Sequence, residues 1–263
     1  MDEKTHTLPL GGTSMDYLRF GGGSRALVVI PGLNLRGVGE TRYTWLRMYR
    51  PFSEDYEIFV FDRKADVPQG YDLAGMAEDT AQAMDALGIR QADVIGISQG
   101  GMIAQYLALD RPELVRKLVL GVTMSRPNET IRRAVRQWTA LAERGDFNGI
   151  ARDVMERAYS DDYLETFGKL LLKASAMRGV PPLDRFAVLT KACLTCDTYD
   201  RLGDIRCPVL VLGGRKDRVL TGEASVELAE KLGCELYMYE DLGHSAWEEA
   251  GDFNARALAF LRE

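Results

Sequence analysis

Apolar runs of strand length alternate along most of this sequence with longer segments that have helical periodicity. The apolar-rich runs that predict strands lie at 26–30, 57–61, 93–95, 117–122, 209–212 and 235–239. A run such as 26–30 is apolar at every position, which is typical of a strand buried on both faces in a parallel sheet. Between the runs, the segment 73–87 has apolar residues at the spacing of an amphipathic helix. The pattern therefore predicts an α/β fold, in which a mostly parallel sheet carries helices on both faces.

The N-terminal segment has a different pattern. Residues 14–20 alternate between apolar and polar with a period of two, which predicts a strand, and three glycines at 21–23 predict a hairpin-like turn after it. Ahead of this strand, His6 lies in a charged tail. We therefore expect the His6 side chain to be solvated.

The alternation stops between residues 127 and 203, where the periodicity is helical throughout. Helices are expected at 129–142, 150–159, 163–177 and 183–196. Strand-like runs resume after this block, so it is inserted between two strands of the sheet. We expect a core made of residues 1–126 and 204–263, with 127–203 forming a helical cap over the C-terminal edge of the sheet.

Length and composition exclude several classes of protein. A chain of 263 residues is long enough for a sizeable core, and 46% hydrophobic and 27% charged residues are ordinary for a globular protein. The net charge of -6 gives no electrostatic reason to expect nucleic acid or an anionic membrane as partner. No apolar run has the length of a transmembrane helix, and the first residues lack the pattern of a secretory signal. We therefore expect a cytoplasmic protein.

The four cysteines are Cys193, Cys196, Cys207 and Cys234. They are too few for a disulfide framework in a chain of this size. The first two form a C-x-x-C pair, but the chain has two histidines and no second cysteine pair close by, whereas a metal site needs about four such ligands. We expect reduced structural thiols, with no metal and no organic cofactor.

The sequence GISQG at 96–100 is the strongest chemical signal. It follows the predicted strand at 93–95 and precedes an apolar segment that predicts a buried helix. A serine on such a strand-to-helix turn is pushed out of the sheet with its hydroxyl exposed, and flanking glycines let strand and helix pack closely. Chance alone would supply this spacing in roughly one such chain in ten, so the strand and the helix around it carry the prediction. Ser98 is the predicted nucleophile.

A serine nucleophile needs a general base, usually a histidine that is held by a carboxylate. His244 follows the last predicted strand and so emerges at the edge of the sheet where ligands gather. Asp217 follows the strand at 209–212, and the chain order Ser98, Asp217, His244 favours it as the orienting acid. Glu223 and Asp241 are the alternative acids.

The developing oxyanion needs two preorganised N–H donors. The backbone N–H of Gln99, the residue after the nucleophile, is one candidate. The other is the backbone N–H of Leu33, in the loop that follows the strand at 26–30, where Gly32 lets the backbone turn towards the serine.

Together these motifs resemble the α/β-hydrolase superfamily over nearly the whole chain. The resemblance rests on the segments 31–33, 96–101, 111–120, 213–217 and 243–244. It is strongest for capped serine members, which include esterases, lipases and perhydrolase-like proteins. Many relatives carry His-Gly where this chain has Pro31 and Gly32. The resemblance therefore does not extend to the detail of the oxyanion loop. Dehalogenases and epoxide hydrolases carry aspartate at the elbow, so Ser98 argues against those two branches.

The resemblance implies a serine hydrolase that cleaves a small carboxylic ester, thioester or lactone through an acyl-enzyme, with a small-molecule acyl substrate as its partner. Three alternatives use the same triad for C–C bond hydrolysis, acyl transfer or perhydrolysis, and a fourth is a slow-turnover receptor that binds a ligand. Nothing in the sequence assigns the oligomeric state.

The predicted cap is the part of the chain that bears on substrate choice. Its apolar candidates for contact with the substrate are Trp138, Leu141, Phe147, Tyr159, Tyr163, Phe167, Leu170, Leu171 and Met177. Arg132, Arg133 and Arg136 share about one helical turn and offer a site for a substrate carboxylate, although a solvated helix face is the expected role.

Overall fold

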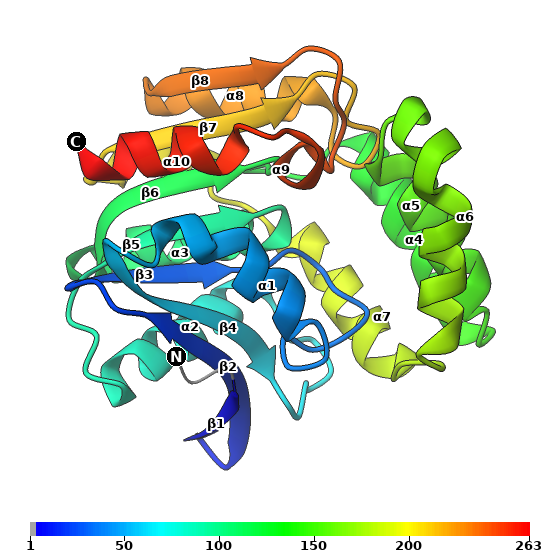
Figure 1. Cartoon of the computed structure of the whole chain (residues 1–263), viewed down its shortest axis with the longest axis horizontal. Coiled ribbons are helices and arrows are strands. Elements are labelled where there is room, and N and C mark those ends of the chain that lie inside the picture. Colours follow the sequence, from blue (N-terminus) through cyan, green and yellow to red (C-terminus); the bar gives the residue numbers. More distant parts are fainter. Residues whose placement is uncertain (1–3) are drawn as a thin grey trace.

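The apolar runs form one eight-stranded sheet in the computed structural model, which describes residues 4–263 (Figure 1). In sheet order the strands are β1 (Thr5–Leu10), β2 (Thr13–Gly21), β4 (Tyr56–Lys64), β3 (Arg25–Ile30), β5 (Ala92–Ile97), β6 (Val115–Gly121), β7 (Val209–Gly214) and β8 (Glu235–Tyr239). The β1–β2 and β2–β4 pairs are antiparallel, and the five pairings from β4 to β8 are parallel. The predicted fold class is confirmed.

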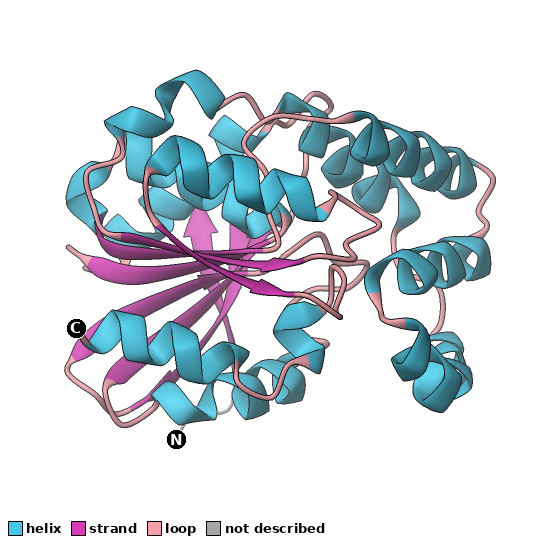
Figure 2. Ribbon diagram, turned by 90° about the horizontal axis from the view of Figure 1, so that it is seen from above, coloured by secondary structure: helices cyan, strands magenta, loops and turns pink. Residues whose placement is uncertain are grey.

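Helices cover both faces of the sheet (Figure 2). The helices of the core are α1 (Arg42–Tyr49), α2 (Leu73–Ala86), α3 (Gln99–Asp110), α8 (Gly222–Leu232), α9 (Ala246–Glu249) and α10 (Phe253–Arg262). One apolar cluster packs α2, α3 and α8 on one face, and a second packs α1, α9 and α10 on the other. Successive residues of β5 divide between the clusters, Val94 in the first and Ile95 in the second, which explains why that run is apolar on both faces.

Four helices follow β6 and precede β7: α4 (Glu129–Glu143), α5 (Phe147–Ala158), α6 (Asp161–Met177) and α7 (Leu183–Ala192), called the cap helices below. They lie beyond one end of the strands (Figures 1 and 2). The first three begin at capping side chains, where Asn128, Asp146 and Ser160 each accept a hydrogen bond from a backbone N–H of the first turn. The division of the chain into core and cap domains at residues 127 and 203 stays a prediction.

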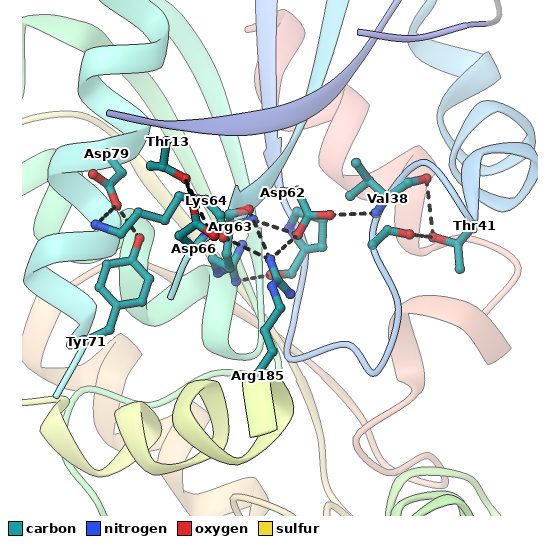
Figure 3. Close-up of polar contacts among 12 residues, drawn as sticks. Thr13, Val38, Thr41, Asp62, Arg63, Lys64, Asp66, Tyr71, Asp79 and Arg185 are labelled. Atoms are coloured by element: carbon teal, nitrogen blue, oxygen red, sulfur yellow. Dashed lines mark hydrogen bonds and ion pairs between the residues drawn. The ribbon is translucent and has the colours of Figure 1, made fainter. Parts of the chain in front are cut away.

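Helix α7 is fastened to the end of β4 (Figure 3). Arg185 of α7 donates to the carbonyls of Arg63 at 3.0 Å and Lys64 at 3.3 Å, and it pairs with Asp62 at 3.3 Å. Asp62 also accepts a hydrogen bond from the backbone N–H of Val38 at 2.9 Å. One carboxylate therefore ties the loop after β3 and helix α7 to the same strand end.

The structure corrects the expectations for the N-terminal segment. His6 lies in strand β1 with its ring stacked 5.2 Å from that of Tyr17, not in a solvated tail. The glycines at 21–23 do not form a hairpin-like turn, because β4 lies between β2 and β3 in the sheet. Two of them are needed for close packing instead, since a Cβ on Gly21 would lie 2.2 Å from the carbonyl oxygen of Tyr56 and one on Gly23 would lie 1.9 Å from the carbonyl carbon of Asp55.

Two further differences concern helices. Helix α1 was not predicted, and the helix expected at 183–196 ends at residue 192 and continues as a short 3₁₀ turn. Within residues 4–263, no helix combines the length and the apolar character that are needed to span a bilayer.

Candidate active site

Ser98 occupies a strained turn between β5 and α3. Its φ of 53° and ψ of −119° are unusual for a residue with a side chain. The turn is held by neighbouring backbone: the Ser98 N–H donates to the Gly121 carbonyl at 2.8 Å, and the Ser98 carbonyl accepts from the Gly101 N–H at 2.9 Å and from the Thr123 hydroxyl at 2.7 Å. These bonds keep a side chain in a conformation that it would otherwise avoid.

The glycines of the motif are required by the close approach of α3 to the sheet. A Cβ on Gly100 would lie 1.9 Å from the carbonyl oxygen of Ile30, and one on Gly96 would lie 2.6 Å from the Gly100 carbonyl oxygen. Both neighbours are backbone atoms, which cannot move aside as a side chain can. The spacing of the pentapeptide therefore follows from packing around the serine.

The structure brings Ser98, His244 and Asp217 together at the C-terminal edge of the sheet. His244 Nε2 lies 2.9 Å from Ser98 Oγ, and His244 Nδ1 lies 2.7 Å from Asp217 Oδ2. Because Nδ1 faces a carboxylate, it carries the ring proton, which leaves Nε2 as the acceptor for the serine hydroxyl. The Asp217 side chain is 2% exposed and that of His244 is 12% exposed.

Backbone donors fix the second oxygen of Asp217. Oδ1 accepts hydrogen bonds from the N–H groups of Val219 at 2.7 Å and Leu220 at 2.8 Å. The two alternative acids lie elsewhere: Asp241 is 92% exposed and pairs with Lys216, and Glu223 is exposed in the first turn of α8. Of the three acids considered from the sequence, Asp217 is the one that contacts His244.

Both candidate oxyanion donors lie beside Ser98. Gly32 approaches the serine so closely that a Cβ there would be 3.2 Å from Ser98 Cβ, and the adjacent Leu33 lines the same cavity as the serine. Gln99 is the first residue of α3, where the backbone N–H has no partner within the helix. Neither N–H donates to another group in the part of the chain that the structure describes.

The side chain of Gln99 makes contacts that the sequence motif does not indicate. It is buried, and its Nε2 donates to the carbonyl of Leu189 at 2.6 Å and to the sulfur of Cys193 at 3.2 Å. Leu189 belongs to α7 and Cys193 follows it. The residue after the nucleophile is thus bonded directly to a cap helix.

Arg63 is a buried cation that the sequence analysis missed. Its Nη2 donates to the Pro31 carbonyl at 2.7 Å and to Gln99 Oε1 at 3.3 Å, so it joins the loop after β3 to the elbow. Burial lowers the pKa of its guanidinium to about 10. The available signal was a charged residue two positions after the apolar run at 57–61, at the edge of the sheet where the site lies.

A cavity of about 200 Å³ opens onto Ser98 and His244. Its lining is mostly hydrocarbon and comes from the loop after β3, from α3, from the cap helices and from the loop after β7: Leu33, Asn34, Leu35, Ser98, Met102, Ile131, Trp138, Val154, Ala158, Phe186, Cys193, Val219, Leu220 and His244. Burial raises the pKa of the Cys193 thiol to about 11, so this group is neutral. Within residues 4–263, no three His, Cys, Asp or Glu side chains are grouped as a metal site requires.

One of the apolar cap residues that were considered from the sequence reaches the cavity. Trp138 lines the cavity, but the other apolar candidates do not, and Phe167, Leu170 and Met177 are exposed on α6. The three arginines of α4 form a solvated face: all are exposed, and Arg133 and Arg136 pair with Glu129. The sequence does not distinguish the buried side of a cap helix that faces the cavity from the side that faces another helix.

Comparisons with known proteins place this geometry in a family. The family model described as the alpha/beta hydrolase fold matches residues 25–250. The chain belongs to the α/β-hydrolase fold family. This match covers the elbow, the acid, the histidine and the cap helices.

Two relatives are similar to this chain in sequence over most of its length. The chain is 30% identical over 238 residues to a protein of Caulobacter sp. (strain K31) that bears the name "Putative carbamate hydrolase RutD", with 86% of this chain and 88% of that protein covered. It is 25% identical over 223 residues to 3-oxoadipate enol-lactonase 2 of Acinetobacter baylyi, with 82% and 80% covered. These relatives are hydrolases by name, and this α/β-hydrolase is a hydrolase.

Solved structures have the same architecture. The enol-lactonase from Burkholderia xenovorans superposes with a TM-score of 0.86 at 21% identity, and 98% of this chain and all of that one (100%) are covered. The hydrolase MGS-M2 from a deep-sea metagenome library of the Medee basin has a TM-score of 0.87 at 21% identity, with 98% of each chain covered. At this level of identity the likeness concerns the fold.

Proposed function

We propose that this α/β-hydrolase is a serine hydrolase that cleaves a small carboxylic ester, thioester or lactone through an acyl-enzyme. The observation that carries the proposal is the chain of two hydrogen bonds from Ser98 to His244 to Asp217, in the wall of a small apolar cavity. Nucleophile, base and orienting acid have the mutual geometry that such a triad requires.

The reaction follows from the donors and acceptors of these side chains. Ser98 Oγ attacks the acyl carbon while His244 Nε2 accepts its proton, and the Asp217 carboxylate stabilises the imidazolium that forms. The N–H groups of Leu33 and Gln99 bind the oxyanion of the tetrahedral intermediate. His244 then gives the proton to the leaving group. A water molecule, deprotonated by His244, attacks the acyl-enzyme, and Ser98 regains its proton as the acid departs.

The names of the relatives support an acyl carbon as the point of attack. A lactone is a cyclic ester, and a carbamate also has a carbonyl carbon that is bonded to an oxygen, with a nitrogen in place of the ester's carbon. Carbamate cleavage is therefore a second candidate reaction, favoured by the relatives with that word in their names. The proposed substrate is a small molecule, and the proposed chemistry uses no metal or organic cofactor.

A fluorophosphonate probe tests the nucleophile. We expect stoichiometric labelling of Ser98 in the native protein and none in Ser98→Ala, with mass spectrometry of the labelled peptide as the readout. Ser125→Ala is a control, because Ser125 is a buried serine that does not line the cavity. A native protein that does not react with the probe would remove Ser98 from this role.

Turnover then separates the reaction classes. Ethyl butyrate, a butyryl thioester, γ-butyrolactone and an alkyl carbamate present the four kinds of acyl carbon, and acid release can be followed by pH-stat titration. Hydrolysis of one of the first three supports the proposal, and hydrolysis of the carbamate alone supports the second candidate. Labelling without turnover of any compound would favour a slow-turnover receptor that binds its ligand.

A further inference from the structure

The chemical character of the cavity restricts what this site accepts. Apart from Ser98 and His244, the polar side chains of its lining are the amide of Asn34 and the neutral thiol of Cys193. No charged side chain is part of the lining that the described residues provide. A volume of about 200 Å³ is below the range of roughly 300–1,000 Å³ that is common for ligand pockets.

Two carboxylates beside the cavity, those of Asp153 and Asp217, are engaged elsewhere. Asp153, the carboxylate next to Val154, accepts from Trp138 Nε1 at 2.7 Å and pairs with Arg157 at 2.7 Å. Asp217 uses both oxygens, one on His244 and the other on two backbone N–H groups.

Arg36 and Arg63 are engaged as well. Arg36, the residue after Leu35 of the lining, pairs with Glu40 at 3.1 Å and donates to the Gly179 carbonyl. Arg63 donates to Pro31 and Gln99 from behind the loop after β3. A carboxylate in the cavity would meet none of these cations.

We infer that the site selects uncharged substrates with a short acyl chain and rejects those that carry a carboxylate near the scissile carbonyl. The inference rests on the proposed serine hydrolase activity and names its substrate class. A carboxylate that enters the cavity exchanges its water shell for a mostly hydrocarbon lining and finds no cation there to neutralise its charge, which is costly in a protein interior. An uncharged carbonyl or ether group loses much less, and the Asn34 amide can pair with it.

Two esters of matched shape test the inference. Ethyl levulinate and monoethyl succinate have the same chain length and end in a methyl ketone and a carboxylate, respectively. At pH 7.5, with acid release followed by pH-stat titration, we expect kcat/KM to be at least about 100-fold higher for the levulinate. Values within about threefold of each other would overturn the inference.

A charge placed in the lining provides the reverse test. Val154 is half-buried on α5 and lines the cavity, so a longer side chain there can reach the cavity without unfolding the helix. Val154→Lys should raise kcat/KM for monoethyl succinate by about fivefold or more over Val154→Gln, which has an uncharged side chain of similar length. Equal values in the two variants would contradict the inference, because the missing cation would then not be the cause.

Failure of the inference and failure of the proposed function give different results. Turnover of ethyl pentanoate and fluorophosphonate labelling of Ser98 depend on the triad and involve no charged substrate. If both are absent, the proposed function is wrong and the inference is lost with it. If both are present and the succinate ester is hydrolysed as fast as the levulinate, the inference alone is wrong.

Discussion

Replacement of Asp217 by asparagine is expected to invert the tautomer of His244. Oδ1 of residue 217 accepts two backbone N–H groups, so the asparagine oxygen is held in that position and the amide NH₂ faces His244 Nδ1. Nδ1 must then accept a hydrogen bond, which moves the ring proton to Nε2. His244 would donate towards Ser98 instead of accepting its proton.

The size of the effect follows from losing the base while keeping the fold. We expect kcat to fall by about 10³–10⁴, equivalent to about 4–5.5 kcal/mol of activation free energy. KM should change little, because Asp217 does not line the cavity. Three bonds to a carboxylate become bonds to a neutral amide, so the free energy of unfolding should drop by about 1–2 kcal/mol and the protein should remain folded.

Stopped-flow hydrolysis of p-nitrophenyl acetate measures acylation directly, and thermal unfolding followed by circular dichroism checks the fold. Asp241→Asn is the matched control, since Asp241 is an exposed aspartate near the same histidine in sequence, and its kcat should equal that of the native enzyme. A folded Asp217→Asn protein with kcat within about threefold of native would refute the tautomer argument.

Three further changes have defined outcomes. Gly100→Ala would place a Cβ 1.9 Å from the Ile30 carbonyl oxygen, so we expect destabilisation of more than about 3 kcal/mol in chemical unfolding, and a well-folded variant would contradict the packing argument. Trp138→Ala removes a large side chain from the cavity wall, so kcat/KM for ethyl octanoate should rise relative to ethyl butyrate, and an unchanged ratio would mean that this wall does not limit chain length. Burial raises the pKa of the Cys193, Cys207 and Cys234 thiols to about 11, so at pH 8 the thiolate fraction of each is about 10⁻³. Iodoacetamide should therefore label the native protein slowly, and the urea-unfolded protein rapidly at all four cysteines. Equal labelling rates in the two states would contradict the burial of these thiols.

Features that depend on residues close together in the chain could be predicted from the sequence. The buried strands could be predicted because β5 and its neighbours contact an apolar cluster on each face of the sheet. Such strands need apolar residues at nearly every position, and these appear in the sequence as apolar runs. The turn at Ser98 could be predicted because the glycines around it satisfy local packing constraints. His244 and Asp217 could be placed at the same edge of the sheet because each follows a strand, and the three side chains lie in contact there.

Contacts between distant segments could not be predicted in this way. Strand β1 pairs along its length with β2, but its polar half and its position ahead of a glycine pair resemble a tail. The contact between Arg63 and Pro31 joins positions 32 residues apart, and that between Gln99 and Leu189 joins positions 90 residues apart. Nothing in the local sequence of either pair indicates its partner, because only the folded sheet brings the segments together.

The bond from Gln99 to Leu189 has a consequence for recombination between members of this family. Helix α7 is tied to the elbow through Gln99 and to β4 through Arg185, whereas α6 has one buried residue, Gly168. A crossover placed after α7 would import a helix without its matching side-chain partners at positions 62 and 99. A crossover in the loop between α6 and α7 is therefore expected to preserve these contacts, because α7 then stays with the strand ends that it binds.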